Sequence, residues 1–253
     1  MSKPKVTLIT VSYNSENTIK DTIESVLKQD YEFIEYIIVD GASNDSTNKI
    51  IQSYQGHISK VISERDKGIY DAMNKGLRAA TGDIIGIINS DDFYPENNII
   101  TKVVEKFESQ PNAGLVLGSI DFVKTNNLNK SVRKYTSKNF SPWLMRFGIM
   151  PPHPAAFIKH DAYEKVGEYK LGYRIAADFD LLLRLLKIKK LTYSKIDLVC
   201  VRMRLGGVST EGISSFNLIS QELLQSLKEN KVYSNSMFVL LRVFSKVKQL
   251  VFK

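Results

Sequence analysis

Short apolar runs alternate with amphipathic segments over the first 120 residues of the chain. The runs predict buried strands, and the apolar positions that recur every three or four residues between them predict helices. The expected strands are Val6–Val11, Tyr36–Val39, Val61-Ile62, Ile84–Ile88 and Leu115–Ile120. The expected helices begin near Ser15, near Ser46, at Ile69 and at Ile99. This alternation predicts an α/β fold with a mainly parallel central sheet and helices on both of its faces.

Polar, acidic or small residues follow three of the expected strands. These clusters are Ser12-Tyr13-Asn14, Asp40-Gly41-Ala42-Ser43 and Asn89-Ser90-Asp91-Asp92. In a parallel sheet the carboxyl ends of the strands lie along one edge, and ligands bind beyond that edge. The pattern therefore predicts a ligand site built from these three clusters.

The second half of the chain has a less regular pattern. The segment from Pro142 to Pro154 is rich in proline and aromatic residues and includes Trp143, the only tryptophan. A helix is expected from Asp178 to Lys187, a strand from Leu191 to Met203, and a turn at Gly206-Gly207. Since no repeat and no linker interrupts the sequence, we expect one compact domain with a trailing helix.

The composition narrows the class of protein. The 253 residues are 43% hydrophobic and 25% charged, which is typical of a globular chain and excludes collagen-like, low-complexity and disordered classes. Cys200 is the only cysteine, so an internal disulfide and a cysteine-based zinc site are both excluded, and a reducing, cytoplasmic location fits. The apolar run that ends at Ser12 has the pattern of neither a signal peptide nor a membrane span.

The net charge of +8 is concentrated near the carboxyl end. Residues 231–253 contain five basic residues and no acidic one, and without them the net charge falls to +3. A basic tail on a nearly balanced domain argues against a nucleic-acid partner. Apolar residues recur at helical spacing from Val239 to Val251, so we expect an amphipathic helix on an anionic membrane surface. The alternative is a helix that packs on the domain or on a second subunit, and the oligomeric state stays open.

The acidic pair Asp91-Asp92 is the strongest chemical signal. Two adjacent carboxylates on one loop repel each other when both are charged, and a divalent cation offsets that repulsion. Such a cation is usually bound by one or two carboxylates together with substrate phosphates. The pair therefore predicts a site for Mn²⁺ or Mg²⁺, and an acidic turn that caps a helix is the alternative.

Asp40 and the residues that follow it are the second signal. A carboxylate at a strand end can accept hydrogen bonds from an imide N–H or from ribose hydroxyls, and an ordinary turn with a helix cap is the alternative. No Gly-x-Gly-x-x-Gly follows a strand and no Gly-Lys-Ser/Thr loop occurs, so the dehydrogenase and P-loop classes lose their main support. A metal or cationic side chains would then neutralise the phosphates, and Arg65, Lys67 and Lys75 are the candidates.

Two further features carry possible chemistry. Asp178 and Asp180 lie at the start of an expected helix, where the helix dipole stabilises a carboxylate whether or not it reacts. Residues two positions apart on a helix point about 200° apart, so only one of the two can face a substrate. His153 lies between prolines on a stiff loop and is either a substrate contact or a structural residue.

Six motifs follow one another along the chain. They are Val11-Ser12-Tyr13-Asn14, Asp40-Gly41-Ala42-Ser43-Asn44-Asp45-Ser46-Thr47, Glu64-Arg65-Asp66-Lys67-Gly68-Ile69-Tyr70-Asp71-Ala72-Met73-Asn74-Lys75-Gly76, Asn89-Ser90-Asp91-Asp92, Asp178 and Gly206-Gly207-Val208-Ser209. In this order they resemble the motifs of family 2 glycosyltransferases, and above all of the small bacterial enzymes that build surface polysaccharides. The resemblance is dense from about Val6 to Ile120, sparser to about Ser209, and does not cover the residues after about Phe216.

The resemblance implies a GT-A fold and an inverting, metal-dependent transfer from a nucleotide-sugar, with UDP favoured, to a glycan or lipid-linked glycan. By this resemblance Asp92 would bind the metal that bridges the diphosphate, with Asp91 beside it, and Asp178 would be the general base. Asp40 would face the nucleobase, Asn14 would lie near the nucleotide, and Asp66 would contact the donor. The remaining residues expected to contact substrate are Ser12, Tyr13, Ser43, Lys67, Asn74, Lys75 and His153.

Three departures from the family pattern qualify this picture. The metal motif is Ser90-Asp91-Asp92 rather than a spaced Asp-x-Asp, which leaves the division of roles between the two Asp residues open. Ala177 stands where a Glu often precedes the catalytic Asp. No Gln-x-x-Arg-Trp follows Asp178, a motif that processive synthases of the family carry, so we expect transfer of a single sugar.

The domain organisation follows from the extent of the resemblance. A GT-A domain is expected over residues 1–215, with a nucleotide-sugar-binding half over 1–120 and an acceptor-side half over 121–215. An amphipathic basic helix is expected over 216–253. Together with the cytoplasmic setting, this tail predicts a peripheral position on the inner face of the plasma membrane.

Two other classes of protein remain as alternatives. A metal-dependent nucleotide phosphohydrolase or nucleotidyltransferase would use Asp91 and Asp92, but it would need further carboxylates or a lysine-rich loop near the first strand. That strand ends in Ser12, Tyr13 and Asn14 only. A non-catalytic nucleotide-sugar-binding module would bind without turnover, and the presence of Asp178 argues against it.

Overall fold

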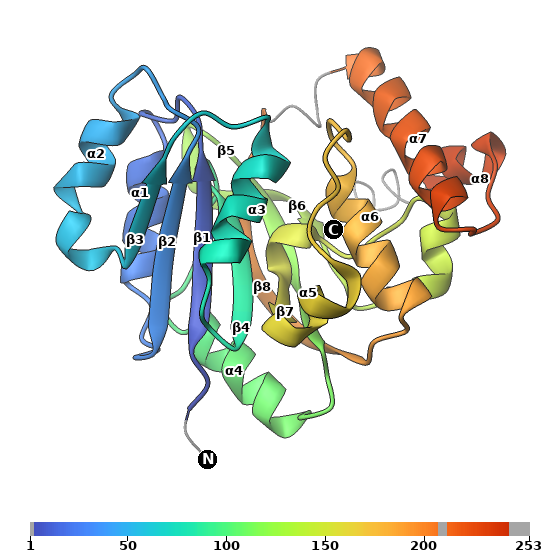
Figure 1. Cartoon of the computed structure of the whole chain (residues 1–253), viewed down its shortest axis with the longest axis horizontal. Helices are drawn as coiled ribbons and strands as arrows, with labels where there is room; N and C mark the ends of the chain where they lie inside the picture. Colours follow the sequence, from blue (N-terminus) through green and yellow to red (C-terminus); the bar gives the residue numbers. More distant parts are fainter. Residues whose placement is uncertain (1–2, 207–211, 243–253) are drawn as a thin grey trace.

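The computed structural model describes residues 3–206 and 212–242, whose strands form one sheet (Figure 1). The strands of its first half are β1 (Val6–Ser12), β2 (Ile34–Asp40), β3 (Lys60–Ser63) and β4 (Ile84–Asn89). They pair in parallel in the order β3-β2-β1-β4. The hydrophobic pattern predicts this half of the sheet correctly.

The second half of the sheet is mixed. Its strands are β5 (Leu115–Lys124), β6 (Asn127–Tyr135), β7 (Ala156–Lys159) and β8 (Tyr193–Arg204). β7 lies between β4 and β5 and runs antiparallel to both, β6 is antiparallel to β5, and β8 is parallel to β5. The hydrophobic pattern predicts neither β6 nor β7, because β6 is largely polar and β7 is only four residues long.

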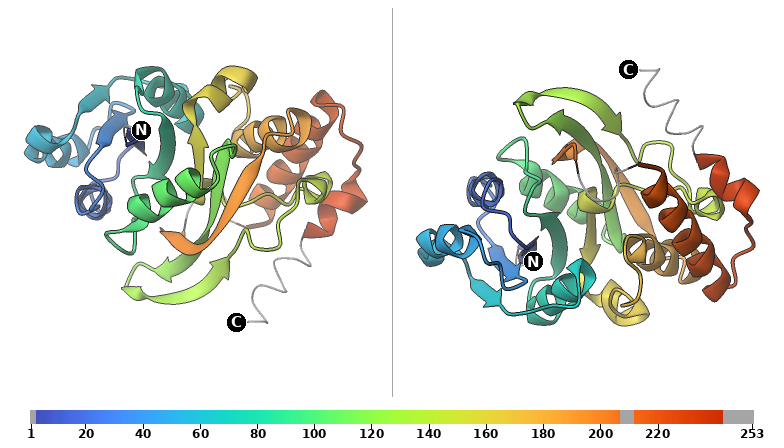
Figure 2. Two further views of the ribbon diagram at one scale, coloured as in Figure 1. Left: turned by 90° about the horizontal axis from the view of Figure 1, so that it is seen from below. Right: turned by 90° about the horizontal axis from the view of Figure 1, so that it is seen from above.

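Helices cover both faces of the sheet, as the alternation of elements predicts (Figure 2). The helices α1 (Ile19–Leu27), α2 (Thr47–Ser53) and α4 (Ile99–Ser109) share one apolar core with the face that carries Leu8. The opposite core contains Ile9 of the same strand, because successive side chains of a strand point to opposite faces. The helices that contribute to this second core are α3 (Ile69–Ala79), α5 (His160–Val166), α6 (Ala177–Leu183) and α7 (Gly212–Glu229).

Several short helical segments complete the described chain. The 3₁₀ helices are η1 (Gln55–His57), η2 (Pro142–Phe147) and η3 (His153–Ala155). The helix α6 continues directly into a π-helical segment, η4 (Arg184–Ile188). The helix α8 (Ser236–Leu240) packs against α7 and η2.

Both expected boundaries within the chain fall inside elements. The division at residues 120/121 lies within β5, and the division at 215/216 lies within α7. Leu223 and Leu227 of α7 and Val239 of α8 are buried in the core, so the tail expected from residue 216 packs on the domain as far as Arg242, as in the alternative to a membrane-bound helix. Val239 and Arg242 are buried and are not available to a membrane.

The rest of the expected amphipathic helix, residues 243–253, lies outside the described residues, as does most of the Gly206-Gly207-Val208-Ser209 motif. Over the ranges 3–206 and 212–242, no helix has both the length and the hydropathy that a bilayer crossing requires.

Candidate functional site

The carboxyl ends of β1, β2 and β4 lie side by side at one edge of the sheet, as predicted. Ser12, the last residue of β1, is in register with Asp40, the last residue of β2. Val11 is in register with Asn89 at the end of β4. The loops beyond these strands also touch, because the hydroxyl oxygens of Ser15 and Ser90 lie 2.7 Å apart. The fold thus brings the three polar clusters into one site.

Asp40 is buried at the base of this site, and neighbouring groups saturate its carboxylate. Oδ1 accepts hydrogen bonds from the hydroxyls of Ser12 (3.1 Å) and Ser43 (2.5 Å). Oδ2 accepts from the backbone N–H of Ser43, the amide of Asn48 and the hydroxyl of Ser63. A carboxylate offers about four lone-pair positions, and these contacts occupy both of its oxygens. Asp40 therefore organises the loop after β2, and the expectation that it faces a nucleobase stays a prediction.

Asn14 joins the loops that follow β1 and β2. Its backbone N–H donates to Oγ of Ser43 at 2.8 Å, and its side-chain oxygen accepts from the N–H of Asn44 at 3.0 Å. The residue has a φ of +47°, in the left-handed region that asparagine tolerates better than most residues. Asn14 therefore shapes the site, with Ser12 and Ser43 buried or half-buried below it.

Tyr13 and Asp66 flank the backbone of Gly41. A Cβ atom at Gly41 would lie 2.4 Å from Oδ2 of Asp66 and 3.3 Å from Cδ2 of Tyr13. Oδ1 of Asp66 accepts the N–H of Gly68 at 2.9 Å, whereas Oδ2 has no hydrogen-bond partner among the described residues. Tyr13 is exposed. An exposed ring and an available carboxylate oxygen are therefore presented on either side of a glycine backbone.

The three residues expected from the long motif at the start of α3 have different positions. Lys67 is exposed, and no ion pair of its side chain occurs within the described chain. Asn74 is buried, and its amide donates to the carbonyl oxygen of Tyr169 and accepts the N–H of the same residue. Lys75 donates to the carbonyl oxygen of Arg65. Both side chains are engaged with the protein, Lys75 also through ion pairs with Glu64 and Asp71, and their contact with substrate stays a prediction.

Asp91 and Asp92 follow β4 on a loop that α1 holds in place. The hydroxyl of Thr22 donates to the carbonyl oxygens of Ser90 at 3.0 Å and Asp92 at 2.7 Å. Asp91 is half-buried and Asp92 is fully buried. Burial raises the pKa of both carboxyl groups, and the neighbouring charge of Asp91 raises the pKa of Asp92 further. The two carboxylates therefore favour a compensating positive charge.

The loop offers oxygen ligands of the kind that a hard divalent cation uses. Oδ1 of Asp92 and Oδ1 of Asn89 are both buried without a hydrogen-bond partner, which is costly for a polar atom. Within the described ranges no group of three or more His, Cys, Asp or Glu residues is placed to hold a metal. A cation here would therefore draw further ligands from a bound diphosphate and water, as Mg²⁺ commonly does. The residues present fit Mn²⁺ or Mg²⁺ in that role.

Arg204, at the end of β8, is a member of the site that the sequence motifs do not single out. Its guanidinium donates to the carbonyl oxygen of Asp91 at 2.5 Å and pairs with Asp21 of α1. Its positive charge partly offsets the effect of burial on the pKa of Asp91 and Asp92. The sequence gives one sign of Arg204, its position two residues before Gly206-Gly207. Its contact with the loop of Asp91 and Asp92 forms only when the fold brings β8 beside that loop.

Asp178 lies in the first turn of α6 and is half-buried. Burial raises the pKa of its carboxyl to about 7, even though Oδ1 accepts the N–H of Phe179 at 2.7 Å. The helix N-terminus therefore does not hold the pKa of Asp178 in its usual range. A carboxyl whose pKa lies near neutral pH is suited to general-base catalysis, because it both accepts and releases a proton there.

Three tyrosines lie within reach of the charge of Asp178. Burial raises the pKa of Tyr70, of Tyr135 (to about 12) and of Tyr169, and the negative charge of Asp178 adds to each of these shifts. Tyr70 belongs to the first turn of α3, which follows the Asp66 loop. This contact links the surroundings of Asp178 to the half of the domain that carries the strand-end clusters.

The loop that leads into α6 is held by residues distant in sequence. The carboxylate of Glu222, on α7, accepts the backbone N–H groups of Arg174 (2.6 Å), Ile175 (2.9 Å) and Ala176 (2.8 Å). The hydroxyl of Tyr70 donates to the carbonyl oxygen of Ile175. The start of α6 is therefore fixed between α3 and α7.

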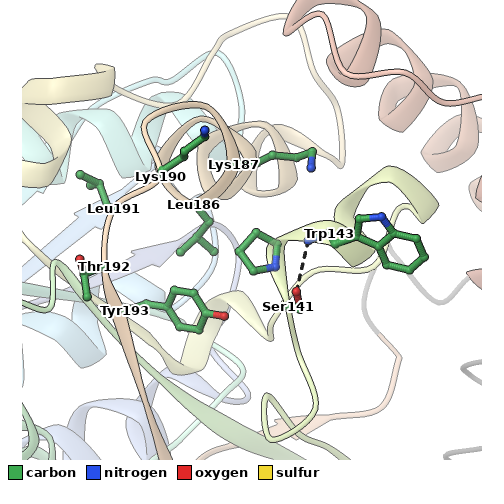
Figure 3. Close-up of a pocket in the computed structure, with 9 residues that line it drawn as sticks. Ser141, Trp143, Leu186, Lys187, Lys190, Leu191, Thr192 and Tyr193 are labelled. Atoms are coloured by element: carbon green, nitrogen blue, oxygen red, sulfur yellow. Dashed lines mark hydrogen bonds between the residues drawn. The ribbon is translucent and has the colours of Figure 1, made fainter.

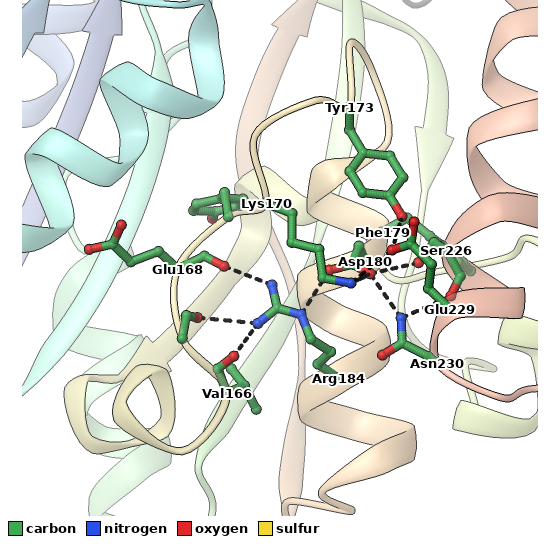
Figure 4. Close-up of polar contacts among 12 residues, drawn as sticks. Val166, Glu168, Lys170, Tyr173, Phe179, Asp180, Arg184, Ser226, Glu229 and Asn230 are labelled. Atoms are coloured by element: carbon green, nitrogen blue, oxygen red, sulfur yellow. Dashed lines mark hydrogen bonds and ion pairs between the residues drawn. The ribbon is translucent and has the colours of Figure 1, made fainter.

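Asp180 has a different environment from Asp178 (Figure 4). It is fully buried, and Arg184, Lys170, Ser226 and Asn230 all donate to its carboxylate. These donors come from the α6–η4 helix, the loop before it, and α7 with the residue that follows it. As its position on the helix predicts, Asp180 does not share the surroundings of Asp178.

His153 is buried in the 3₁₀ helix η3. Its Nε2 lies 2.6 Å from the hydroxyl of Tyr169, and burial lowers the pKa of the imidazole to about 4. The ring is neutral at physiological pH and its Nε2 contacts Tyr169, which favours the structural alternative for His153 over a substrate contact. His153 braces one of the tyrosines beside Asp178.

Comparison with known proteins gives one family. Residues 7–167 match glycosyl transferase family 2, which is more than half of the chain. A Mycobacterium tuberculosis protein named as an uncharacterized glycosyltransferase is 29% identical over 188 residues, which cover 72% of this chain and 69% of the relative. TuaG of Bacillus subtilis, named as a putative teichuronic acid biosynthesis glycosyltransferase, is 39% identical over 100 residues, which cover 38% of this chain and 40% of TuaG.

A solved structure has the same fold. The mannosyltransferase PcManGT from Pyrobaculum calidifontis, determined in complex with GDP-Man and Mn²⁺, superposes with a TM-score of 0.69 at 19% sequence identity. The match covers all of this chain and 71% of PcManGT. The predicted GT-A architecture is therefore confirmed at the level of the fold.

Proposed function

Because the chain belongs to glycosyl transferase family 2, we propose that it is an inverting enzyme that moves one sugar from a nucleotide-sugar to a glycan hydroxyl. The observation that carries this proposal is the pairing of two distinct acidic centres in one domain. One is the buried Asp91-Asp92 loop with its unpartnered oxygens, and the other is Asp178 with a pKa near neutral.

The donor nucleotide is proposed to bind against the loops after β1 and β2. The exposed ring of Tyr13 can pack on a nucleobase, and Oδ2 of Asp66 can accept a hydrogen bond from the donor. We propose that Ser12, Asn14 and Ser43 do not touch the donor themselves. Their hydrogen bonds hold Asp40 and the two loops in place. We propose a UDP-sugar as the donor to be tested first, with GDP- and dTDP-sugars beside it.

The diphosphate is proposed to lie at the acid loop. Asp92, with Asp91 beside it, would hold Mn²⁺ or Mg²⁺, which when bound supplies positive charge to the departing diphosphate. Arg204 keeps the loop in position through the carbonyl oxygen of Asp91. The exposed side chain of Lys67, which forms no salt bridge in the described chain, is free to approach a phosphate.

Asp178 is proposed to be the general base of a single displacement. Its carboxylate takes the proton of the acceptor hydroxyl while that oxygen bonds to the anomeric carbon. In the same step the bond between the anomeric carbon and the diphosphate oxygen breaks, and the electron pair leaves with the nucleoside diphosphate. A single displacement from the opposite face inverts the configuration.

The acceptor is proposed to be a precursor of a cell-surface polysaccharide, either a glycan or a lipid-linked glycan. The similarity to TuaG, whose name refers to teichuronic acid biosynthesis, supports this acceptor class. A lipid-linked acceptor would place the enzyme in the cytoplasm against the inner face of the plasma membrane. The net charge of residues 1–230 is only +3, which does not favour a nucleic acid as the acceptor.

The test is a nucleoside diphosphate release assay over a panel of sugar nucleotides, with Mn²⁺ or with EDTA, with and without extracts of bacterial glycolipids as acceptor. The proposal expects metal-dependent release of a nucleoside diphosphate that an acceptor accelerates. Release of a nucleoside monophosphate and a sugar phosphate would instead identify a phosphohydrolase. Nucleotide binding by thermal shift without any release over the panel would identify a binding module.

A further inference from the structure

Three stretches of the chain lack acidic residues, and the fold brings them together. They are residues 122–160, 181–196 and 230–242. The first two each contain several lysines or arginines, and the third contains Lys231 and the buried Arg242. The first includes η2, the second includes η4, and the third includes α8. Contacts join η2 to both η4 and α8. One surface of the domain is therefore built from three segments that lack acidic residues and are distant in sequence.

Aromatic side chains join η2 to α8 on this surface. The rings of Phe147 and Phe238 stack with centroids 4.9 Å apart, and the rings of Trp143 and Phe147 also lie 4.9 Å apart. Tyr233 meets Phe238 edge to face at 6.1 Å. A backbone contact supports the same junction, because the hydroxyl of Ser234 donates to the carbonyl oxygen of Arg146 at 2.6 Å. The surface is thus a defined packing unit of the fold.

Large apolar side chains of this unit remain in contact with solvent. The exposed fractions are 53% for Trp143, 72% for Tyr233, 63% for Met237, 53% for Leu240 and 42% for Leu241. Exposed apolar side chains that occur singly need no explanation, but a cluster of this kind marks an interaction surface. We name Trp143, Tyr233, Met237, Leu240 and Leu241 the apolar cluster.

Three cations border the apolar cluster without acidic partners. The guanidinium of Arg146 lies 5.4 Å from the centroid of the Trp143 ring, and Lys187 and Lys190 line a hollow of about 510 Å³ beside Trp143 (Figure 3). None of the three forms a salt bridge with any described residue. Burial lowers the pKa of Lys187, and the positive charges of Arg146 and Lys190 lower it further.

We propose that the apolar cluster and the cations Arg146, Lys187 and Lys190 form a face that docks on an anionic lipid bilayer. Tryptophan and tyrosine favour the interface between headgroups and acyl chains, and lysine and arginine bind anionic headgroups. A second copy of the chain is unsuited to this face, because in a symmetric dimer the unpaired cations of one copy would face the same cations of the other. The described residues of the face offer no carboxylate for a basic partner either.

The proposed docking has a consequence for the site. The continuous helix α6–η4 carries Asp178 in its first turn and Lys187 in its last. Docking at the η4 end would hold the acceptor side of the domain at a fixed height above the bilayer. The inference extends the proposed function, since it would present the site to a lipid-linked acceptor. Vesicle binding is measured without donor or acceptor. A failure to bind vesicles therefore contradicts this inference alone, and a failure to transfer sugar contradicts the proposed function.

The experiment is co-sedimentation of the full chain with vesicles of phosphatidylcholine alone and of phosphatidylcholine with 30 mol% phosphatidylglycerol. We expect binding to the anionic vesicles only. Two variants test the face: Lys187→Glu with Lys190→Glu, and Trp143→Ser with Tyr233→Ser and Met237→Ser. Since each basic residue near an anionic surface contributes about 1 kcal/mol, the charge variant should lose at least about tenfold in partitioning. The apolar variant should lose a similar factor.

A matched control separates the face from overall charge. Lys49→Glu with Lys60→Glu changes the net charge equally, and these lysines lie on α2 and β3, on the opposite side of the molecule from α8 (Figure 1). The control should bind as the parent does, and circular dichroism should show that all variants are folded. The proposal is overturned if the parent does not bind anionic vesicles, if the face variants bind like the parent, or if the control loses as much. A parent that is dimeric by light scattering, with face variants that are monomeric, would also overturn it in favour of a subunit interface.

Discussion

Nε of Arg184 lies 2.7 Å from Oδ2 of Asp180, so that the more buried of the two carboxylates in the first turn of α6 is already paired inside the protein. Asp178, two residues earlier, forms no ion pair within the described residues and is partly open to solvent. The two acids therefore have separable roles. Asp180 holds the α6–η4 helix against α7, and Asp178 is available to react.

This difference predicts opposite outcomes for two conservative variants. Asp178→Asn should lower the turnover number by about 10²- to 10⁴-fold, the usual contribution of a general base, and should leave donor and metal affinity nearly unchanged. Asp180→Asn should leave Arg184 and Lys170 near a buried neutral group and cost about 3–5 kcal/mol of unfolding free energy. Steady-state kinetics and urea unfolding measure the two effects. Turnover within tenfold of the parent for Asp178→Asn, beside a folded but inactive Asp180→Asn, would transfer the base to Asp180.

The pKa of Asp178 predicts how activity and stability depend on pH. Burial raises this pKa to about 7, so the reactive carboxylate is lost as the pH falls through 7, and kcat/KM should decline below that value. The same shift has a stability cost. Because the pKa in the folded state lies above the ordinary value of 3.8, the charged form opposes folding, fully above about pH 7 and not at all below about pH 4.

Asp178→Asn should therefore be more stable than the parent at pH 8, with the difference vanishing near pH 4. The gain is at most about 4 kcal/mol, since one pKa unit corresponds to about 1.4 kcal/mol, and solvent at the half-buried carboxylate reduces it. Thermal unfolding at the two pH values checks the sign. Equal melting temperatures of parent and variant at pH 8 would contradict the raised pKa.

Glu222 is predicted to position Asp178 and to tune its pKa. Its carboxylate holds three successive backbone N–H groups before α6, and its charge is one of the causes that raise the pKa of Asp178. Glu222→Gln removes that charge and one of the two acceptor oxygens. The turnover number should fall, and the acid limb of the kcat/KM profile should move to lower pH.

The shift of the pH profile distinguishes this role from a purely structural one. Gln221→Ala, at an exposed neighbouring position on α7, is the matched control and should change neither quantity. A Glu222→Gln variant with reduced turnover but an unmoved acid limb would show that Glu222 supports the loop without influencing the titration of Asp178.

Gly41 is predicted to be required for donor binding because of its distance from Asp66. A methyl group at this position would lie 2.4 Å from Oδ2 of Asp66, which is too close for any contact, so Asp66 or the ring of Tyr13 must move. Gly41→Ala should weaken binding of the nucleoside diphosphate by at least about tenfold, or about 1.4 kcal/mol, by isothermal titration. Gly56→Ala is the control, since a Cβ there meets no atom within 4 Å. Equal affinities of the two variants would remove Gly41, Asp66 and Tyr13 from the donor site.

The parts of the fold that could be predicted from the sequence are those in which neighbouring residues alone give a clear hydrophobic pattern. The strands β1, β2 and β4 are apolar runs, and their register brings Ser12, Asp40 and Asn89 to one edge without any further information. The polar strand β6 and the short strand β7 have no such signal. Their place in the sheet is set by pairing with β5, which is a contact between distant residues.

The candidate site could likewise be predicted only in part. Motif spacing selects the candidate acidic residues, but it does not show whether a side chain points to a ligand or to the protein. Asp40, Asn74 and His153 turn inward because their partners, Ser63, Tyr169 and others, are supplied by other segments. A motif search does not find Arg204 or Glu222, because their partners are also distant in sequence. Each acts on a loop more than 40 residues away in sequence.

Asp92 is predicted to be the main metal ligand, because Oδ1 of its carboxylate is buried at the end of β4 with no hydrogen-bond partner. Asp92→Asn keeps the shape of the side chain and removes the charge that a divalent cation requires. The variant should fold, lose glycosyl transfer, and lose the Mn²⁺-dependent part of nucleoside diphosphate binding. In the parent, ligand at one hundred times its dissociation constant should stabilise the fold by about 2.7 kcal/mol, which a thermal-shift assay detects readily.

Asp91→Asn is the matched control for this assignment, since Asp91 is only half-buried and lies next to Asp92 on the same loop. It should weaken the Mn²⁺-dependent stabilisation less than Asp92→Asn does, because Asp92 retains its charge and its unpartnered oxygen. The measurement is the difference in melting temperature with nucleoside diphosphate in Mn²⁺ and in EDTA for the three proteins. If Asp91→Asn abolishes that difference and Asp92→Asn preserves it, Asp91 binds the metal and the buried carboxylate of Asp92 only supports the loop.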